Sequence, residues 1–166
     1  EVPLPTGGGG VPYPWSGSLA VGNDGLVWAA TWEHGLFAFD GAAFTRYTTD
    51  AVLPSDHIFQ VASAGDGTIW AAIERSGIAS FDGTSWTSYT TADGLLSDDA
   101  AVTAGADGTV WAVHYEIPPY GYSRFDGIGW TSYPFDGPVG GWRSEVAPDG
   151  TLWTISDEGL ISFDGI

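Results

Sequence analysis

The stretch that decides the fold is Ile58–Thr91, which reads IFQVASAGDGTIWAAIERSGIASFDGTSWTSYTT. It divides into four short runs rich in β-branched and aromatic residues, separated by Asp66-Gly67, Ser76-Gly77 and Asp82-Gly83. These dipeptides favour tight hairpin turns, because glycine adopts a positive φ without steric cost. Three hairpins in succession predict a four-stranded antiparallel meander.

The same pattern recurs along the chain at a nearly constant spacing. The motif Asp-Gly-x-aliphatic-Trp places tryptophans 42, 41 and 42 residues apart, at Trp28, Trp70, Trp111 and Trp153. The motif Phe-Asp-Gly begins at Phe39, Phe81, Phe125 and Phe163. A third motif, aromatic-Thr-x-Tyr, ends at Tyr47, Tyr89 and Tyr133. Because equivalent positions recur, we expect all eight tryptophans and phenylalanines of the first two motifs to lie in the core.

Four-stranded repeats of about 40–45 residues are typical of a β-propeller. The sequence therefore predicts an all-β propeller of about four blades, each a four-stranded antiparallel sheet. We expect the blades at approximately 18–49, 56–91, 100–134 and 143–166 within a propeller domain of residues 11–166. Residues 1–10, rich in proline and glycine, are expected to form a flexible tether.

The two ends of the chain carry complementary strand patterns. Tyr13-Pro14-Trp15-Ser16-Gly17 resembles residues 133–137, which follow the fourth strand of the third repeat, and the fourth repeat stops after its third strand. An unfinished sheet exposes unpaired N–H and C=O groups along its edge. We therefore expect the N-terminal strand to complete the last blade, in cis or in trans. The residues of this strand-exchange interface would be Val11, Pro12, Tyr13, Leu160 and Ser162.

The repeat is similar to a known family. The segments Tyr47-Thr48-Thr49 and Leu53-Pro54-Ser55, followed by Asp66-Gly67-Thr68-Ile69-Trp70, resemble the two-component-regulator propeller repeat, and the likeness covers most of residues 18–166. The resemblance implies the propeller fold and a sensor-like role outside the cytoplasm. Members of that family typically have seven blades followed by a transmembrane helix and a signalling module, whereas this sequence has about four repeats.

The composition excludes several classes of partner. A net charge of −17, from 21 acids against four arginines and no lysine, repels nucleic acids and anionic membrane surfaces. Eight of the acids are the aspartates of the two recurrent Asp-Gly motifs, so turn formation explains them better than a calcium site. Cysteine is absent, which excludes disulfides and thiolate ligands. The lack of lysine and methionine favours an extracellular or periplasmic location for a secreted protein.

The meander places the first and third turns of each blade at one edge, and the second turn with the inter-blade loops at the other. The second edge is irregular, and irregular loops often carry function. Aromatic side chains beside polar groups can stack a sugar or a peptide. The candidate ligand-face residues are Trp32, His34, Arg75, Tyr115, Tyr120, Trp142 and Arg143. The alternative that Trp32 and Trp142 pack between blades stays open.

No catalytic motif is recognisable: the sequence has no Gly-x-Ser-x-Gly, phosphate loop or His-Glu-x-x-His. The three histidines, His34, His57 and His114, are scattered over the first three repeats, with His34 and His114 at non-equivalent positions. We therefore expect no enzyme, no metal site and no cofactor. Some antibiotic-opening lyases share Asp-Gly-x-x-Trp repeats, which makes a metal-dependent lyase the least favoured alternative.

Two functions remain. The first is a structural, self-assembling module, with the chain itself as partner, that forms a fibre or filament by strand exchange between subunits. The second is a sensor-like module that binds a glycan, a peptide or a small molecule on the loop-rich face. The surface of that face and the oligomeric state discriminate between them.

Overall fold

The computed structural model describes residues 18–50, 52–137, 143–156 and 159–165. In this part of the chain the regular structure is all β, apart from one 3₁₀ turn, η1 (Thr91–Asp93). The strands form four antiparallel sheets in chain order, as expected for the blades of a propeller. The tether expected at residues 1–10 and the strand expected at 11–13 lie outside the described residues.

Each of the first three blades is a four-stranded meander. Blade 1 contains β1 (Leu19–Val21), β2 (Val27–Thr31), β3 (Gly35–Phe39) and β4 (Phe44–Tyr47). Blade 2 contains β5 (Ile58–Ser63), β6 (Ile69–Ile73), β7 (Gly77–Phe81) and β8 (Trp86–Tyr89). Blade 3 contains β9 (Ala101–Ala104), β10 (Val110–His114), β11 (Tyr120–Phe125) and β12 (Trp130–Phe135). Blade 4 has three described strands, β13 (Ser144–Val146), β14 (Leu152–Ser156) and β15 (Gly159–Phe163).

The Asp-Gly motifs form the turns that the sequence predicts. In the first turn of blade 2, the Asp66 carboxylate accepts a hydrogen bond from the backbone N–H of Thr68 at 2.9 Å, and Gly67 has φ +93°. In the third turn, the Asp82 carboxylate accepts from the N–H groups of Thr84 and Ser85, both at 2.8 Å. These bonds stabilise the ionised carboxylate and lower the pKa of Asp82. The aspartates are thus occupied by the backbone of their own turns.

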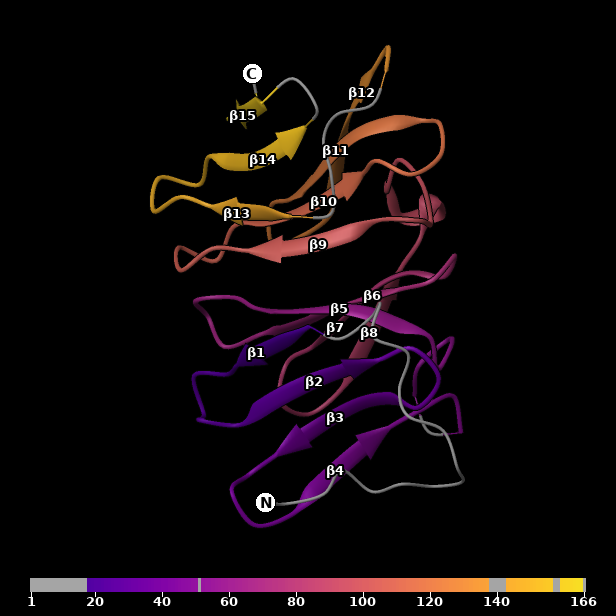
Figure 1. Cartoon of the computed structure of the whole chain (residues 1–166), viewed down its shortest axis with the longest axis vertical. Helices are drawn as coiled ribbons and strands as arrows, with labels where there is room; N and C mark the ends of the chain where they lie inside the picture. Colours follow the sequence, from indigo (N-terminus) through magenta and orange to yellow (C-terminus); the bar gives the residue numbers. More distant parts are fainter. Residues whose placement is uncertain (1–17, 51, 138–142, 157–158, 166) are drawn as a thin grey trace.

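The blades are arranged as in a propeller. The first strands β1, β5, β9 and β13 contact one another in sequence, while β4, β8 and β12 form the far edges of their sheets. The blades follow one another along the long axis of the molecule, and Figure 1 places β4 of blade 1 and β15 of blade 4 at its opposite ends. The row of described blades therefore presents an outward face at each end.

Aromatic side chains fill the junction between successive blades. Trp28 of blade 1 stacks on Tyr47 of its own blade, with ring centroids 5.5 Å apart, and contacts Phe81 and Trp86 of blade 2 at 5.7 and 6.4 Å. The next junction repeats this set of four rings with Trp70, Tyr89, Phe125 and Trp130. At the third, Trp111 contacts Tyr133 at 6.1 Å and Phe163 at 5.6 Å. The recurrent motifs thus supply the aromatic side chains that pack at the blade junctions.

Five of the eight expected core residues are not fully buried. The four motif phenylalanines are only partly buried, and Phe39 is not among the residues packed against the core clusters of the described chain. Trp28, Trp70 and Trp111 are 0%, 3% and 0% exposed, whereas Trp153 at the equivalent position of blade 4 is 40% exposed. The expectation of a buried Trp153 is therefore wrong for the described chain. The physical reason is that Trp153 points away from blade 3, toward the end of the row, where no further described blade covers it.

Candidate functional site

The loop-rich edge of the molecule is built from the second turn of each blade and the loop that leads into the next blade. Backbone hydrogen bonds tie these two segments together: Gly35 N–H donates to the carbonyl of Asp56 at 2.9 Å, and Gly77 N–H donates to that of Asp98 at 2.8 Å. The carboxylates of Asp56 and Asp98 accept from the N–H groups of Thr49 and Thr91 at 2.7 and 2.6 Å. The loops are therefore held in a fixed position by the turns.

At the junction of blades 1 and 2 this edge brings three side chains together. The rings of Trp32 and His57 stack with centroids 5.3 Å apart and planes 19° from parallel. His57 Nδ1 lies 3.4 Å from Glu74 Oε2, and both of these side chains are partly exposed. An aromatic ring, an imidazole and a carboxylate thus form one continuous row that solvent can reach.

At the junction of blades 2 and 3, the loops of the same edge carry Arg75, Asp99 and Tyr115. Burial raises the pKa of the Asp99 carboxyl, while the Arg75 guanidinium nearby opposes the rise. Burial also raises the pKa of Tyr115 to about 12, with the charges of Glu116 and Asp99 adding to the effect. Arg75 has φ +49°, a left-handed conformation that is uncommon outside glycine. We call the six residues Trp32, His57, Glu74, Arg75, Asp99 and Tyr115 the loop row.

Residues of the loop row occupy equivalent places in different blades but differ in chemistry. Trp32, Glu74 and Tyr115 each follow the second strand of their blade. His57 and Asp99 each donate a backbone N–H to the serine two residues before them, at 3.1 Å in both cases. The core positions keep their residue types from blade to blade, whereas these positions vary. Variation confined to one edge of a repeat array is typical of a binding surface.

Only some of the seven candidate ligand-face residues lie in the loop row. Trp32, Arg75 and Tyr115 lie in the loop row, and Tyr120 is in β11; both tyrosines are partly buried and pack against the core of blades 3 and 4. His34 bonds through its backbone, where its carbonyl accepts from Arg46 Nε at 2.7 Å. Arg143 is exposed at the start of blade 4, and Trp142 lies outside the described residues. The row also contains His57, Glu74 and Asp99, which the sequence predicts on the same loop-rich edge although they are not among the seven candidates.

His114, at the end of β10, is not part of the loop row. It is fully buried, with Nε2 2.8 Å from Ser123 Oγ and Nδ1 3.3 Å from the carbonyl oxygen of Asp99. Burial penalises the charged imidazolium and lowers the pKa of His114 from 6.5 to about 4. This histidine therefore supports the loop that carries Asp99 instead of facing a ligand.

The two end faces form a second candidate site. The leading face of blade 1 exposes Leu19, Val21 and Val27 at 72%, 66% and 37%, beside the partly buried rings of Phe39 and Phe44. The residues equivalent to Leu19 and Val27 in blade 2, Val61 and Ile69, are only 4% and 2% exposed, because blade 1 covers them. The leading face thus has the composition of a buried junction.

The trailing face of blade 4 has the same character. Trp153, Ile155 and Leu160 are 40%, 57% and 67% exposed. Cross-strand pairing aligns Ile155 and Leu160 with Ala72 and Ile78 of blade 2, which are both fully buried against blade 3. Sequence reasoning placed Leu160 in the strand-exchange interface. It did not predict the exposure of Trp153 and Ile155, because every repeat carries the same core motif, whether or not a blade follows it.

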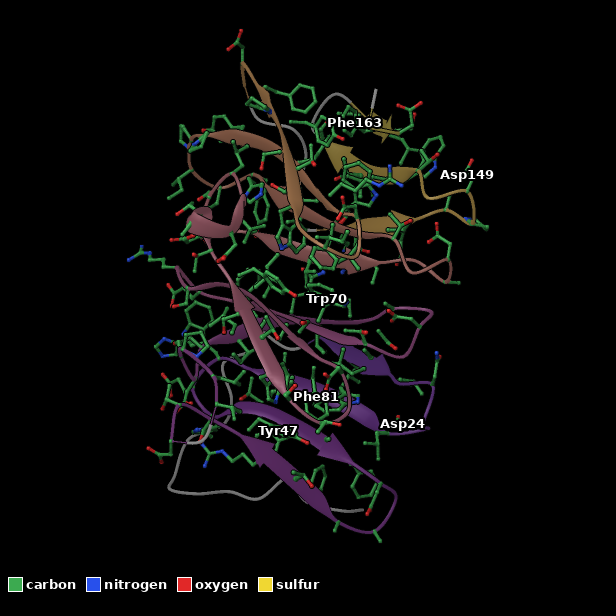
Figure 2. The ribbon with its side chains drawn as sticks, turned by 180° about the vertical axis from the view of Figure 1, so that it is seen from behind. Asp24, Tyr47, Trp70, Phe81, Asp149 and Phe163 are labelled. Atoms are coloured by element: carbon green, nitrogen blue, oxygen red, sulfur yellow. The ribbon has the colours of Figure 1, made fainter. Side chains whose placement is uncertain are left out.

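The opposite edge of the molecule holds the Asp-Gly turns. Figure 2 shows Asp24 and Asp149, from the first turns of blades 1 and 4, on this same edge. No group of three or more histidine or acidic side chains that could hold a metal ion occurs among the residues with described positions. Within the same part of the chain, no helix is long and apolar enough to span a membrane.

Comparison with known proteins gives the fold. No family model and no curated protein matches the sequence. Among solved structures, the extracellular domain of the one-component system BT4673 from B. thetaiotaomicron is similar at a TM-score of 0.68 and 16% identity, over 88% of this chain and 21% of that chain. Virginiamycin B lyase from Staphylococcus aureus gives 0.67 and 19%, over 98% of this chain and 58% of the lyase.

A third similar structure is PorZ, a bacterial surface component of the type-IX secretion system of Porphyromonas gingivalis, with a TM-score of 0.64 and 20% identity over 87% of this chain and 24% of PorZ. The chain spans about a fifth to a quarter of the BT4673 domain and PorZ, and just over half of the lyase. At these identities the likeness is one of fold. The similar structures include extracellular domains of one- and two-component systems, a surface component and an enzyme, so the fold alone does not select a function.

Proposed function

We propose that this chain is a non-catalytic extracellular propeller module with a structural role, which assembles by packing its end faces against further propeller blades. The observation that carries the proposal is the exposure of Leu19 and Leu160, at 72% and 67%, on faces whose counterparts inside the array are buried. The extracellular location is supported by the acidic, lysine-free composition and by the extracellular domains among the similar structures.

The polarity of the end blades supports this role. Both outer faces are apolar, although the molecule carries a net charge of −17. Burying one exposed leucine, isoleucine or valine side chain contributes about 1.5–3 kcal/mol. Several such residues on each face supply a driving force for association.

Strand exchange is part of the proposal. Each complete blade stacks the tyrosine of its fourth strand near its own motif tryptophan, as Tyr47 does on Trp28. Val11, Pro12 and Tyr13 would add that fourth strand beside β15, and Tyr13 would then occupy the equivalent position over Trp153. Insertion into a neighbouring subunit is head-to-tail and gives a ring or a filament.

Light scattering of the intact chain over a hundredfold range of concentration tests the proposal. We expect a mass above that of the monomer that rises with concentration. Ile128, which is 92% exposed in the Asp126–Gly129 turn, provides the control, because Ile128→Asp changes an exposed apolar residue outside both end faces. A monomeric mass at every concentration would contradict the proposal.

A second candidate function is ligand binding at the loop row. The specific observation in its favour is the Trp32–His57 stack with Glu74 beside it, since an aromatic ring flanked by hydrogen-bonding groups is suited to a sugar or a peptide. The probes would be panels of neutral oligosaccharides, acidic oligosaccharides and short peptides. A binding member should raise Tm for the intact chain and for His34→Ala but not for Trp32→Ala. No shift from any panel would remove this candidate.

A further inference from the structure

We propose that the trailing face of one copy of this chain receives the leading face of a second copy, so that the contact between copies repeats the internal junction between two blades. This inference rests on the proposed structural role and names the partner: another molecule of the same chain, in a fixed orientation. The arrangement is heterologous, because each copy contributes a different face.

The first argument is that the two end faces are the two halves of one junction. Every internal junction has a trailing half, which supplies the motif tryptophan and aliphatic residues from the second and third strands. It also has a leading half, which supplies aliphatic residues and the phenylalanine of Phe-Asp-Gly. Blade 4 presents the trailing half, with Trp153, Ile155 and Leu160, and blade 1 presents the leading half, with Leu19, Val27 and Phe39.

The second argument is the aromatic pair on blade 1. Phe39 and Phe44 stack with centroids 4.6 Å apart and planes 30° from parallel. The equivalent pair in blade 2, Phe81 and Trp86, stacks at 5.0 Å and 26°, and that pair contacts the indole of Trp28. The Phe39–Phe44 pair of blade 1 therefore has a geometry close to that of the Phe81–Trp86 pair, which contacts a tryptophan. Trp153 of a second copy is the side chain that would contact it.

The third argument concerns charge. On the leading face, the strands of blade 1 contribute one charged residue, Arg46, whose guanidinium lies 5.7 Å from the ring of Phe37. On the trailing face, the described strands of blade 4 contribute one charged residue, Glu145, which pairs with Trp153 across the sheet. The two charges are opposite in sign. Contact between leading and trailing faces thus avoids the repulsion expected elsewhere between two strongly acidic molecules.

A contact within one chain and a symmetric contact are both less suitable. Blades 1 and 4 lie at opposite ends of the long axis, so the two faces of one copy are separated (Figure 1). A symmetric contact of two trailing faces would set Trp153 against Trp153 and leave the Phe39–Phe44 pair uncovered. Only a contact between the leading face of one copy and the trailing face of another covers both the Phe39–Phe44 pair and Trp153.

A mixing experiment tests the inference. Leu19→Asp destroys the leading face and keeps the trailing one, whereas Leu160→Asp does the reverse. Each variant alone should lose at least tenfold in association constant and remain monomeric where the intact chain assembles. The equimolar mixture, with one variant labelled with ¹⁵N, should give a heterodimer of one labelled and one unlabelled chain in native mass spectrometry. Val21→Asp, also on the leading face at 66% exposure, should behave as Leu19→Asp does.

The outcomes separate the inference from the proposed function. A mixture that stays monomeric while the intact chain assembles would overturn the head-to-tail contact and leave the structural role standing. An intact chain that is monomeric at all concentrations would overturn both. Ile128→Asp should assemble as the intact chain does, and circular dichroism should show the same β signal for all variants.

Discussion

Trp111 donates its indole N–H to the carbonyl oxygen of Gly150, 3.1 Å away in the first turn of the next blade. This bond ties blade 3 to blade 4. The indole nitrogens of Trp28 and Trp70 are buried at the equivalent junctions, and neither has a hydrogen-bond partner among the described residues. These three tryptophans pack at equivalent positions, but they differ in whether the indole N–H has a hydrogen-bond partner among the described residues.

This difference predicts unequal costs for one substitution. Trp111→Phe removes a hydrogen bond, which contributes about 0.5–1.5 kcal/mol, in addition to ring volume. Trp70→Phe loses the same ring volume but also removes a buried N–H that lacks a partner, which relieves part of the cost. We expect the free energy of unfolding in urea to fall further for Trp111→Phe. Equal losses would show that the Gly150 bond does not stabilise the protein.

Trp153 should be less important than Trp70 in the dilute monomer. Deleting a large buried aromatic side chain costs about 3–5 kcal/mol, and Trp70 is 3% exposed. Trp153, at 40% exposure, should cost clearly less when it is replaced by alanine. Urea denaturation at submicromolar concentration measures both variants. A loss for Trp153→Ala as large as that for Trp70→Ala would mean that the trailing face is covered within one chain.

Two glycines test close packing against backbone conformation. Gly77 and Gly83 have φ of +81° and +93°, so alanine is strained at both. A Cβ on Gly77 would collide with the carbonyl oxygen of Tyr89, whereas a Cβ on Gly83 has no atom within 4 Å. Gly83→Ala should cost about 1–2 kcal/mol from strain alone. Gly77→Ala should lower Tm considerably more, and similar shifts in Tm would contradict this account of the second turn.

The buried His114 makes stability depend on pH in a defined window. An unfolded histidine takes up a proton as the pH falls below 6.5, while folded His114 stays neutral down to about pH 4. The unfolded chain therefore binds more protons in this window, and the free energy of unfolding should fall by about 3 kcal/mol from pH 6.5 to pH 4, at ~1.4 kcal/mol per unit.

The turn aspartates should act in a lower window. Hydrogen bonds from their own turns lower the pKa of Asp40, Asp82 and Asp126 below 3.8, so the stability they contribute is present above pH 3.8 and is lost as the pH falls further. Urea denaturation at successive pH values separates the two effects. His114→Gln should flatten the curve between pH 6.5 and 4. An unchanged slope for His114→Gln would show that another group titrates.

Sequence reasoning predicted correctly the features that a residue type determines locally, such as a tight turn. Gly67 and Gly83 adopt the positive φ that a tight hairpin turn demands, so the turns, and with them the strands, could be predicted. Trp28 is buried because a blade follows it, and Trp153 is exposed although its motif is the same. The place of the blade in the array determines whether its motif tryptophan is buried, and the local sequence does not reveal that place.

The loop row was predicted in part for a related reason. Trp32 was recognisable as an aromatic residue outside the strands. His57 and Asp99 are placed by contacts between blades, such as the stack of Trp32 on His57, which pair residues 25 positions apart in the sequence. Such pairs follow from the twist and spacing of the sheets. They become visible only once the blades are placed side by side.

The most direct test of the central claim is hydroxyl-radical footprinting of the intact chain at low and high protein concentration. Oxidation of Leu19, Trp153 and Leu160 should fall severalfold as concentration rises, because the two end faces bury one another between copies. Oxidation of Ile128, 92% exposed on a turn away from both faces, should stay constant and provides the internal control. Equal oxidation of the end-face residues at all concentrations would contradict the account.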